Sequence, residues 1–351
     1  MVDLCAPLDD EVLAAVRSSL RSYGAVGVLD AAVPLGLLRV WEAHVGDVFD
    51  DATLMRTRLT SASGRVRPGW SDWVHDTAGV EVDRYVIAAF DDEQEALAAG
   101  VSRAHVARHG GPNLWPPFDP QLRPLTRRLR VAGRLLVDRL RALAADALAT
   151  PIEHLRGTGP DLLELTVHEH SVRSSRTARS CHRTDGIPTT PPSARIGPNA
   201  GELLGLVRIL PLDGPTSRRP GGRPADALQI RTADGDWTSV TVPEDGFLMV
   251  VGEALATLSG GRWPAGSVQV RFPDDRPQRT LSISHFLGAA TEVSPIAGVA
   301  GGLVPSRPSF SVGQRLLERD LVERAASWRV AGPDGWRRRR PVVTDVVTRY
   351  V

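Results

Sequence analysis

ALQIRTADGDWTSVTVPEDGFLMVVGEALATLSGGRW, residues 227–263, contains three short apolar runs separated by turn-forming residues. The runs predict strands at 227–231, 237–242 and 247–251. Asp234 and Gly235 form a pair typical of a hairpin turn, because glycine reaches backbone angles that other residues avoid. The segment therefore predicts a hairpin followed by a third strand.

Similar short apolar runs lie on both sides of this segment. They predict further strands at 162–170, 203–210, 267–272 and 280–286. The stretches 171–200 and 215–224 separate them, and we expect both to be long loops. The chain after Pro160 is therefore predicted to be rich in β-structure.

The preceding part of the chain has mainly helical patterns. Asp9 is placed to cap a helix that ends at Gly24, and a short strand is expected at 25–29. Pro34 opens a second helix. Leucines spaced three or four residues apart predict a long amphipathic helix over 120–148.

Composition excludes several classes of protein. The chain has 351 residues, 42% of them hydrophobic, which is enough for a sizeable core. Its 42 basic residues are all arginine, yet the net charge is only +1, so we expect no nucleic-acid partner. Two cysteines make no disulfide framework, and no apolar run is long enough for a membrane span. A cytoplasmic protein without a membrane partner is expected, and its oligomeric state is left open.

Three other segments carry a family resemblance. They are LRSYGAVGVLDAAVPLGLL from Leu20, NLWPPF from Asn113 and LSISHFLG from Leu281. Together with residues 227–263, they resemble the isopenicillin-N-synthase-like family of non-haem Fe(II)/2-oxoglutarate-dependent oxygenases, over roughly residues 2–288. The resemblance implies an α+β fold in which N-terminal helices flank a double-stranded β-helix, a jelly-roll or cupin-like core.

The resemblance also implies a domain organisation. Residues 1–290 are expected to form a single oxygenase-like domain, with a mainly helical part at 1–160 and the double-stranded β-helix core at 161–290. Residues 291–351 are expected to be a C-terminal extension with one helix, predicted over 312–326.

Enzymes of this family hold iron with a His-x-Asp motif and a distant histidine. In this chain the distant position is Val268, whose side chain has no lone pair to donate. The first half has two alignments. One uses CHRTDG and gives His182 and Asp185, with two intervening residues in place of one, and the other places Gly201 and Leu203 at the ligand positions. Either alignment implies a degenerate facial triad.

The family anchors 2-oxoglutarate with an Arg-x-Ser motif on one strand face. Ser282 matches the serine, but Thr280 stands at the arginine position. Arg279 lies one residue away and faces outward in a regular strand. Arg279 and Ser282 are the candidate residues for a 2-oxoglutarate-like anchor.

Two more histidines share a strand face. His168 and His170 are placed by the resemblance where relatives carry pocket-lining asparagine and tyrosine. Neutral imidazole binds metals or moves protons near neutral pH. The candidate catalytic residues are therefore His168, His170, His182 and Asp185, of which His182 and Asp185 also serve as metal ligands in a rewired site.

Three functional hypotheses follow. The favoured one is an enzyme of bacterial specialised metabolism, or natural-product biosynthesis, that converts a small organic substrate by cyclisation, elimination or rearrangement without a cofactor. The alternative is an Fe(II)/2-oxoglutarate-dependent oxidoreductase with rewired ligands that performs hydroxylation, desaturation or oxidative cyclisation. The third is a non-catalytic binding or scaffold protein on the same fold.

Overall fold

The described part of the chain contains two large β-sheets, a two-stranded sheet and a set of helices. The computed structural model describes residues 1–29, 33–50, 69–72, 80–100, 103, 113–155, 162–170, 193–196, 202–211, 228–243, 245–272, 278–288, 292–293 and 310–311. Sheet A has eight strands, which in sheet order are β1 (Val2–Asp3), β2 (Ala25–Leu29), β10 (Gly246–Val251), β7 (Glu202–Pro211), β12 (Gln278–Gly288), β5 (Leu162–His170), β4 (Val80–Ala88) and β3 (Gly69–Asp72). All neighbouring strands of sheet A are antiparallel except β1 and β2.

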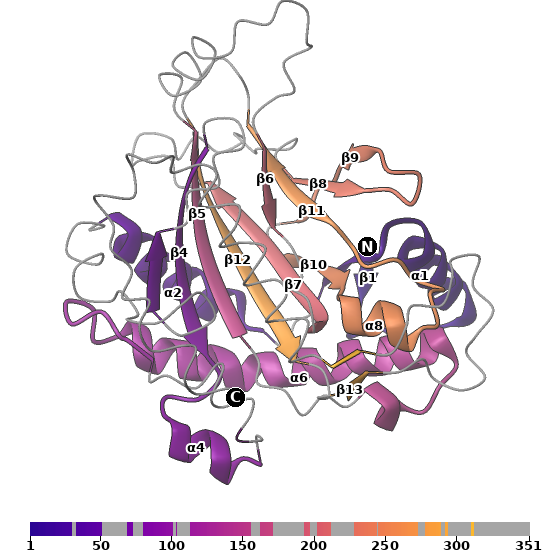
Figure 1. Cartoon of the computed structure of the whole chain (residues 1–351), viewed down its shortest axis with the longest axis horizontal. Coiled ribbons are helices and arrows are strands. Elements are labelled where there is room, and N and C mark those ends of the chain that lie inside the picture. Colours follow the sequence, from indigo (N-terminus) through magenta and orange to yellow (C-terminus); the bar gives the residue numbers. More distant parts are fainter. Residues whose placement is uncertain are drawn as a thin grey trace, which may run out of the picture.

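Sheet B is smaller and entirely antiparallel. Its four strands, in sheet order, are β6 (Ser193–Ile196), β11 (Val268–Arg271), β8 (Leu228–Arg231) and β9 (Trp237–Ser239). A further pair is formed by β13 (Glu292–Val293) and β14 (Phe310–Ser311). Figure 1 shows sheet B beside the upper part of sheet A.

Helices cover one face of sheet A. The described helices are α1 (Asp10–Tyr23), α2 (Leu35–Asp50), α4 (Glu93–Ala98), α6 (Leu122–Leu148), the short 3₁₀-helix η1 (Ile152–Leu155) and α8 (Glu253–Leu258). Apolar residues of α1, α2 and α6 pack in one core with alternate residues of the sheet A strands. The long α6 crosses beneath the strands in Figure 1. We call this the helix-side core.

A second core lies on the opposite face of sheet A. It joins Val80 of β4, Val207 of β7 and Leu248 of β10 to apolar residues of sheet B. This is the inter-sheet core. Because successive side chains of a strand point to opposite faces, β2, β4, β7 and β10 each supply residues to both cores.

The predicted cap of α1 at Asp9 and its predicted end at Gly24 are both confirmed. The Asp9 side chain accepts a hydrogen bond of 2.8 Å from the backbone N–H of Val12. Gly24 ends the helix with a left-handed φ of 59°, and a Cβ atom there would lie 2.4 Å from the carbonyl oxygen of Pro264. Only glycine meets both the backbone angle and the close approach.

Buried polar contacts fix α2 in position. Trp41 Nε1 donates to Thr126 Oγ1 of α6 over 2.9 Å, and both residues are fully buried. Arg208 of β7 forms an ion pair of 2.6 Å with Glu42 of α2. The two contacts tie α2 to α6 and to sheet A. Helix α2 therefore cannot slide without leaving buried polar groups unpaired.

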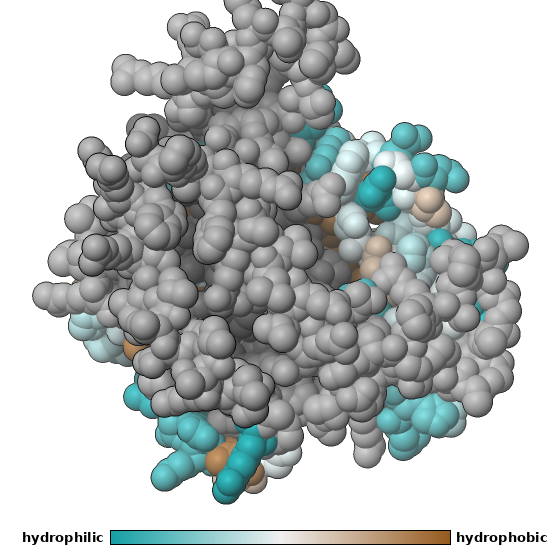
Figure 2. Space-filling model, viewed as in Figure 1, coloured by the Kyte–Doolittle hydropathy of each residue, from teal (hydrophilic) through white to brown (hydrophobic). Residues whose placement is uncertain are grey.

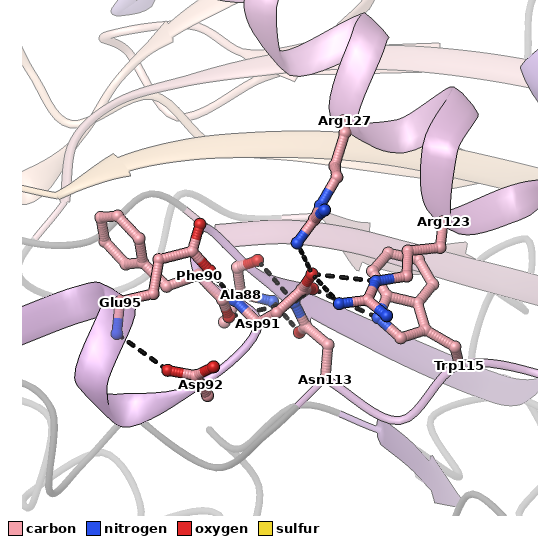
Figure 3. A network of polar contacts seen from close by, with 9 residues as sticks. All are labelled: Ala88, Phe90, Asp91, Asp92, Glu95, Asn113, Trp115, Arg123 and Arg127. Atoms are coloured by element: carbon pink, nitrogen blue, oxygen red, sulfur yellow. Dashed lines mark hydrogen bonds and ion pairs between the residues drawn. The ribbon is translucent and has the colours of Figure 1, made fainter.

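A network around Asp91 docks the segment that begins at Asn113 onto the end of β4 (Figure 3). Asn113 Nδ2 donates to the carbonyl oxygen of Ala88 over 3.1 Å, and Trp115 Nε1 donates to Asp91 over 3.2 Å. Arg123 and Arg127 of α6 also bind the Asp91 carboxylate. Burial on its own raises the pKa of Asp91, but hydrogen bonds from Asn113 and Arg123 and the charges of Arg127 and Arg123 hold it below its ordinary value.

Hydrophilic residues dominate the visible surface of α4 and of the β8–β9 hairpin (Figure 2). Within the described residues, the large hydrophobic side chains that stay exposed are Met1, Val40, Phe118, Val131 and Leu135. No described helix has both the length and the apolarity needed to cross a membrane.

The predicted strands around the hairpin are confirmed, although β9 ends at Ser239, three residues earlier than predicted. Gly235 between β8 and β9 has a φ of 98°, as the predicted turn requires. The prediction of a continuous loop over 171–200 is wrong at 193–196, which form β6. The four residues of β6 are held by pairing with the distant β11. The loop predicted at 215–224 and the helix predicted at 312–326 lie outside the described residues.

Candidate active site

Polar residues gather on three adjacent strands of sheet A, on the side of the inter-sheet core. In β5, Leu163, Leu165 and Val167 point into the helix-side core, so the residues between them face the opposite way. The same alternation turns the even-numbered residues of β4 and β12 toward that side. We call the resulting set the polar wall; it consists of Arg84, Glu164, Thr166, His168, Thr280, Ser282 and Ser284.

The polar wall is ordered in rows by strand register. His168 pairs directly with Thr280 of β12, and Thr166 pairs with Ser282. Arg84 of β4 is the register partner of Thr166 on its other side. Arg84, Thr166 and Ser282 therefore form one continuous row across three strands. Each of the wall residues except Glu164 is more than nine-tenths buried.

His168 and Ser282 form the central contact of this wall. Ser282 Oγ lies 3.0 Å from His168 Nε2 and 3.3 Å from the carbonyl oxygen of Thr166. In the tautomer that satisfies both contacts, Ser282 donates its proton to the carbonyl oxygen of Thr166 and accepts one from His168 Nε2. The imidazole then carries its proton on Nε2 and presents a lone pair at Nδ1.

Burial sets the charge of this imidazole. Desolvation lowers the pKa of His168 to about 3, so the ring is neutral over the physiological range. Its Nδ1 atom is buried and has no hydrogen-bond partner among the described residues. A neutral ring of this kind suits a hydrogen bond to a ligand or a bond to a metal. A proton relay at neutral pH would require charging it, which the environment disfavours.

Thr280 adds a second buried atom without a partner. Its Oγ1 atom accepts and donates no hydrogen bond within the described residues. Leaving a buried hydroxyl unsatisfied costs about 1–3 kcal/mol. Thr280 is paired in register with His168, so the two unsatisfied groups lie on adjacent strands in one row. Such a pair indicates a place for the polar atoms of a bound molecule.

Arg84 and Glu164 form an ion pair on the polar wall. Arg84 is 4% exposed, and Thr166 Oγ1 lies 3.4 Å from the other oxygen of Glu164. Arg84 lies in β4, where no strand was predicted, and Glu164 lies in the predicted strand 162–170 but was not among the candidate residues. VEVDRYVIA, the sequence of β4, carried the missing signal, since valines at 80, 82 and 86 alternate with residues of the other face.

Arg279 and Ser282 lie on opposite faces of β12. Arg279 Nη2 donates to the carbonyl oxygen of Phe49, at the end of α2, over 2.8 Å. Its Nε atom lies 3.9 Å from the carboxylate of Glu169. Ser282, by contrast, belongs to the polar wall. The structure therefore does not bring these two residues together as a single anchor.

Strands β8 and β11 of sheet B present apolar side chains to the inter-sheet core. These residues are Leu228, Ile230, Val268 and Val270, which we call the apolar wall. Val268 is 1% exposed, and its register partners are Ile196 of β6 and Ile230 of β8. The residues paired with Val268 are thus isoleucines, which cannot bind a metal.

Metal ligands are not assembled within the part of the chain that the structure describes. No group of three or more His, Cys, Asp or Glu residues is close enough there to hold a metal ion. Of the candidates, His182, Asp185 and Gly201 lie outside the described residues, and His170 is described only in its backbone. Leu203 is buried in the helix-side core. The described residues therefore do not fit iron beside Val268, whereas the hydroxyls and guanidinium of the polar wall fit a carboxylate.

No family model matches this sequence, and no curated protein matches it. Solved structures do match. A full-length Neurospora crassa protein, in complex with alpha-KG and 5-formyluracil, is 13% identical with a TM-score of 0.67, covering 91% of this chain and 94% of its own. The dioxygenase for auxin oxidation from rice is 16% identical with a TM-score of 0.63, covering 92% and 94%. JOX2, in complex with 2OG, Fe and JA, is 16% identical with a TM-score of 0.61, covering 91% and 84%.

These comparisons correct one expectation. We expected chemistry without a cofactor, and that expectation is contradicted, because the similar structures include complexes with alpha-KG and with 2OG and Fe. The family resemblance drawn from the sequence is confirmed at the level of fold. The chain has the fold of the Fe(II)/2-oxoglutarate-dependent oxygenases.

Proposed function

We propose that the protein is an Fe(II)/2-oxoglutarate-dependent oxidoreductase that acts on a small organic substrate bound between the two sheets. The observation that carries the proposal is the buried polar wall, in which His168 Nδ1 and the Thr280 hydroxyl have no hydrogen-bond partner among the described residues. This chain shares its fold with the Neurospora crassa protein, whose structure contains alpha-KG and 5-formyluracil. The assignment to bacterial specialised metabolism stays a prediction.

The strand order supports a double-stranded β-helix. In sheet A the strands β5, β12, β7 and β10 are consecutive neighbours, and in sheet B the strands are β6, β11, β8 and β9. The chain passes repeatedly between the two sheets, from β5 to β6, back to β7 and on to β8. We propose that these eight strands form the double-stranded β-helix and that β1 to β4 extend one of its sheets.

The polar wall is proposed to bind and orient an organic acid. The Thr280 hydroxyl is placed to donate to a carboxylate oxygen, and the Arg84 guanidinium supplies positive charge in the neighbouring row. Neutral His168 adds a hydrogen-bonding atom without adding charge. The apolar wall excludes water from the opposite side and favours the carbon skeleton of a ligand.

Iron, when bound together with 2-oxoglutarate, would supply the oxidation needed for hydroxylation, desaturation or oxidative cyclisation. We propose His182 and Asp185 as its ligands, because an imidazole and a carboxylate suit ferrous iron and Val268 does not. Both residues precede β6, whose register partner is the strand of Val268.

Metal content and cofactor turnover test the proposal together. The protein is purified anaerobically without chelator, iron is quantified, and succinate formation from 2-oxoglutarate is measured under air. We expect stoichiometric iron after reconstitution and succinate release that requires both iron and 2-oxoglutarate. A protein that binds neither iron nor 2-oxoglutarate after reconstitution would contradict the proposed function.

A further inference from the structure

We propose that Arg84 of β4 is the residue that binds the distal carboxylate of 2-oxoglutarate, in place of an arginine on β12. The inference rests on the proposed function and names the residue that sets its cofactor specificity. Three observations carry it: the face on which each arginine lies, the row in which Arg84 stands, and the ion pair that holds its side chain.

The first observation concerns Thr280 and Arg279. Thr280 faces the polar wall, but its short side chain carries no charge. Arg279 carries a charge, but it binds the carbonyl oxygen of Phe49 on the helix side of sheet A. Strand β12 therefore supplies hydroxyls and no guanidinium to the wall. A dicarboxylate placed there needs its cation from a neighbouring strand.

The second observation is the position of Arg84. It shares a row with Thr166 and Ser282, two strands away from Ser282. Because adjacent strands are about 4.8 Å apart, the Cα atoms of Arg84 and Ser282 are separated by roughly 10 Å. An extended arginine side chain covers most of that distance. A carboxylate beside Ser282 is therefore within reach of the Arg84 guanidinium.

The third observation is Glu164. Its carboxylate pairs with Arg84 and lies beside Thr166 Oγ1, so it holds the guanidinium over the wall. A guanidinium has five N–H donors in a planar fork and accommodates carboxylates on more than one edge. Glu164 thus orients Arg84 and at the same time repels a second anion. Removing its charge should strengthen binding of the ligand, and removing Arg84 should abolish it.

Calorimetric titration of the full chain with 2-oxoglutarate tests the assignment. Arg84→Gln alone leaves Glu164 without its partner and is expected to destabilise the fold. The informative comparison is therefore Glu164→Gln against the double variant Arg84→Gln/Glu164→Gln, which differ only at Arg84. We expect Glu164→Gln to bind 2-oxoglutarate several-fold more tightly than wild type, and the double variant to bind about 10- to 100-fold more weakly than Glu164→Gln.

Two further measurements sharpen the result. 2-Oxopentanoate, which has a methyl group in place of the distal carboxylate, should bind wild type much more weakly than 2-oxoglutarate, and the double variant should lose this preference. Adding Thr280→Arg to the double variant returns a guanidinium to β12 and should restore binding. Arg279→Gln is the matched control and should leave binding unchanged. Circular dichroism establishes that each variant is folded.

The outcomes separate this inference from the proposed function. If the double variant binds 2-oxoglutarate as tightly as Glu164→Gln, Arg84 is not the anchor, while iron-dependent succinate formation would still support the oxidoreductase. If Arg279→Gln abolishes binding, the anchor is Arg279 and the assignment to Arg84 is wrong. If wild type shows no binding of 2-oxoglutarate, both the anchor and the proposed function fail.

Discussion

The polar wall and the apolar wall lie on opposite sides of one core and differ in almost every chemical respect. The polar wall, on sheet A, carries an ion pair, a neutral imidazole and the buried hydroxyls of β12 and β5. The apolar wall presents only leucine, isoleucine and valine from β8 and β11. Because burying polar groups without partners is costly, the difference supports the proposal that a ligand is bound from sheet A.

The two walls also differ from what the family resemblance implies at positions 268 and 280. That resemblance places a metal ligand at position 268 on sheet B and an arginine at position 280 on sheet A. The chain has valine and threonine there, both fully buried. The two register partners of the valine are isoleucines, whereas the threonine lies beside His168 and Ser282. Under the proposed function, the carboxylate would be bound on the polar wall, and iron would be held by residues other than Val268.

Removing the proposed iron ligands should have the largest effect. The double variant His182→Ala/Asp185→Ala is expected to lose iron binding and succinate formation by more than about 100-fold, since each ligand typically matters by a factor of 10 or more. Iron is quantified after anaerobic reconstitution and gel filtration. His154→Ala, a histidine of the exposed η1 turn, serves as the control. Equal iron content in the double variant and wild type would show that these residues are not ligands.

Breaking the ion pair of the polar wall should give the next largest effect. Arg84→Gln is expected to lower the free energy of unfolding by about 3–5 kcal/mol, because Glu164 then remains charged without its partner. Arg84→Gln/Glu164→Gln should recover most of this loss. Urea denaturation followed by tryptophan fluorescence measures both. Arg123→Gln removes an exposed guanidinium from Asp91, which keeps its ion pair with Arg127, and should cost at most about 1 kcal/mol.

If Arg84→Gln were as stable as Arg84→Gln/Glu164→Gln, the ion pair would not be a buried pair in a dry site. That result would mean that water reaches Glu164 freely. The polar wall would then resemble ordinary protein surface.

The buried imidazole predicts a dependence of stability on pH. The folded pKa of His168 is about 3, below the ordinary value of 6.5, so between these values the unfolded chain holds a proton that the folded chain lacks. This contribution is constant above about pH 6.5 and destabilises the fold progressively as the pH falls toward 3. His168→Gln removes it. The stability difference between wild type and His168→Gln should therefore shift against wild type as the pH falls from about 7.5 to 4.5.

Denaturation curves of both proteins at matched pH values provide the check. Carboxylates titrate in both proteins and cancel in the difference. A difference that stays constant with pH would show that His168 is protonated in the folded protein or is accessible to water. The neutral imidazole on the polar wall would then be excluded.

Introducing a ligand on the apolar wall should have the smallest effect. Val268→His places an imidazole at the position where the resemblance expects the distal ligand. We expect iron affinity to rise about tenfold, at a cost of about 1–3 kcal/mol in stability from the buried polar group. Val268→Ala is the control and should leave iron affinity unchanged. If Val268→His binds iron no better than wild type, the other ligands do not approach β11.

Local sequence signals predicted much of the fold. The cap at Asp9, the stop at Gly24 and the alternation in β5 depend on residues a few positions apart, so the pattern of the chain contains them. Strand β6 has only four residues inside a Pro-rich stretch, and it is defined by pairing with β11, more than 70 residues away. Such a strand has no local signature.

Less of the candidate site could be predicted, because it also depends on pairing between residues that are far apart in the sequence. The inward face of Ser282 and the outward face of Arg279 followed from strand alternation. The partner of Arg84 lies 80 residues away, and the depressed pKa of His168 results from burial by several strands. Register across three strands brings these groups together. That information is distributed over the whole chain.

Nitrogen NMR of the His168 ring tests most directly whether the polar wall is the ligand site. Protein labelled with ¹⁵N-histidine is titrated with 2-oxoglutarate before iron is added, and His168→Gln identifies the signals of His168. We predict that both ring nitrogens shift in step with the binding measured by calorimetry, with the larger change at Nδ1. Saturable binding of 2-oxoglutarate that leaves the His168 signals unchanged would contradict the account.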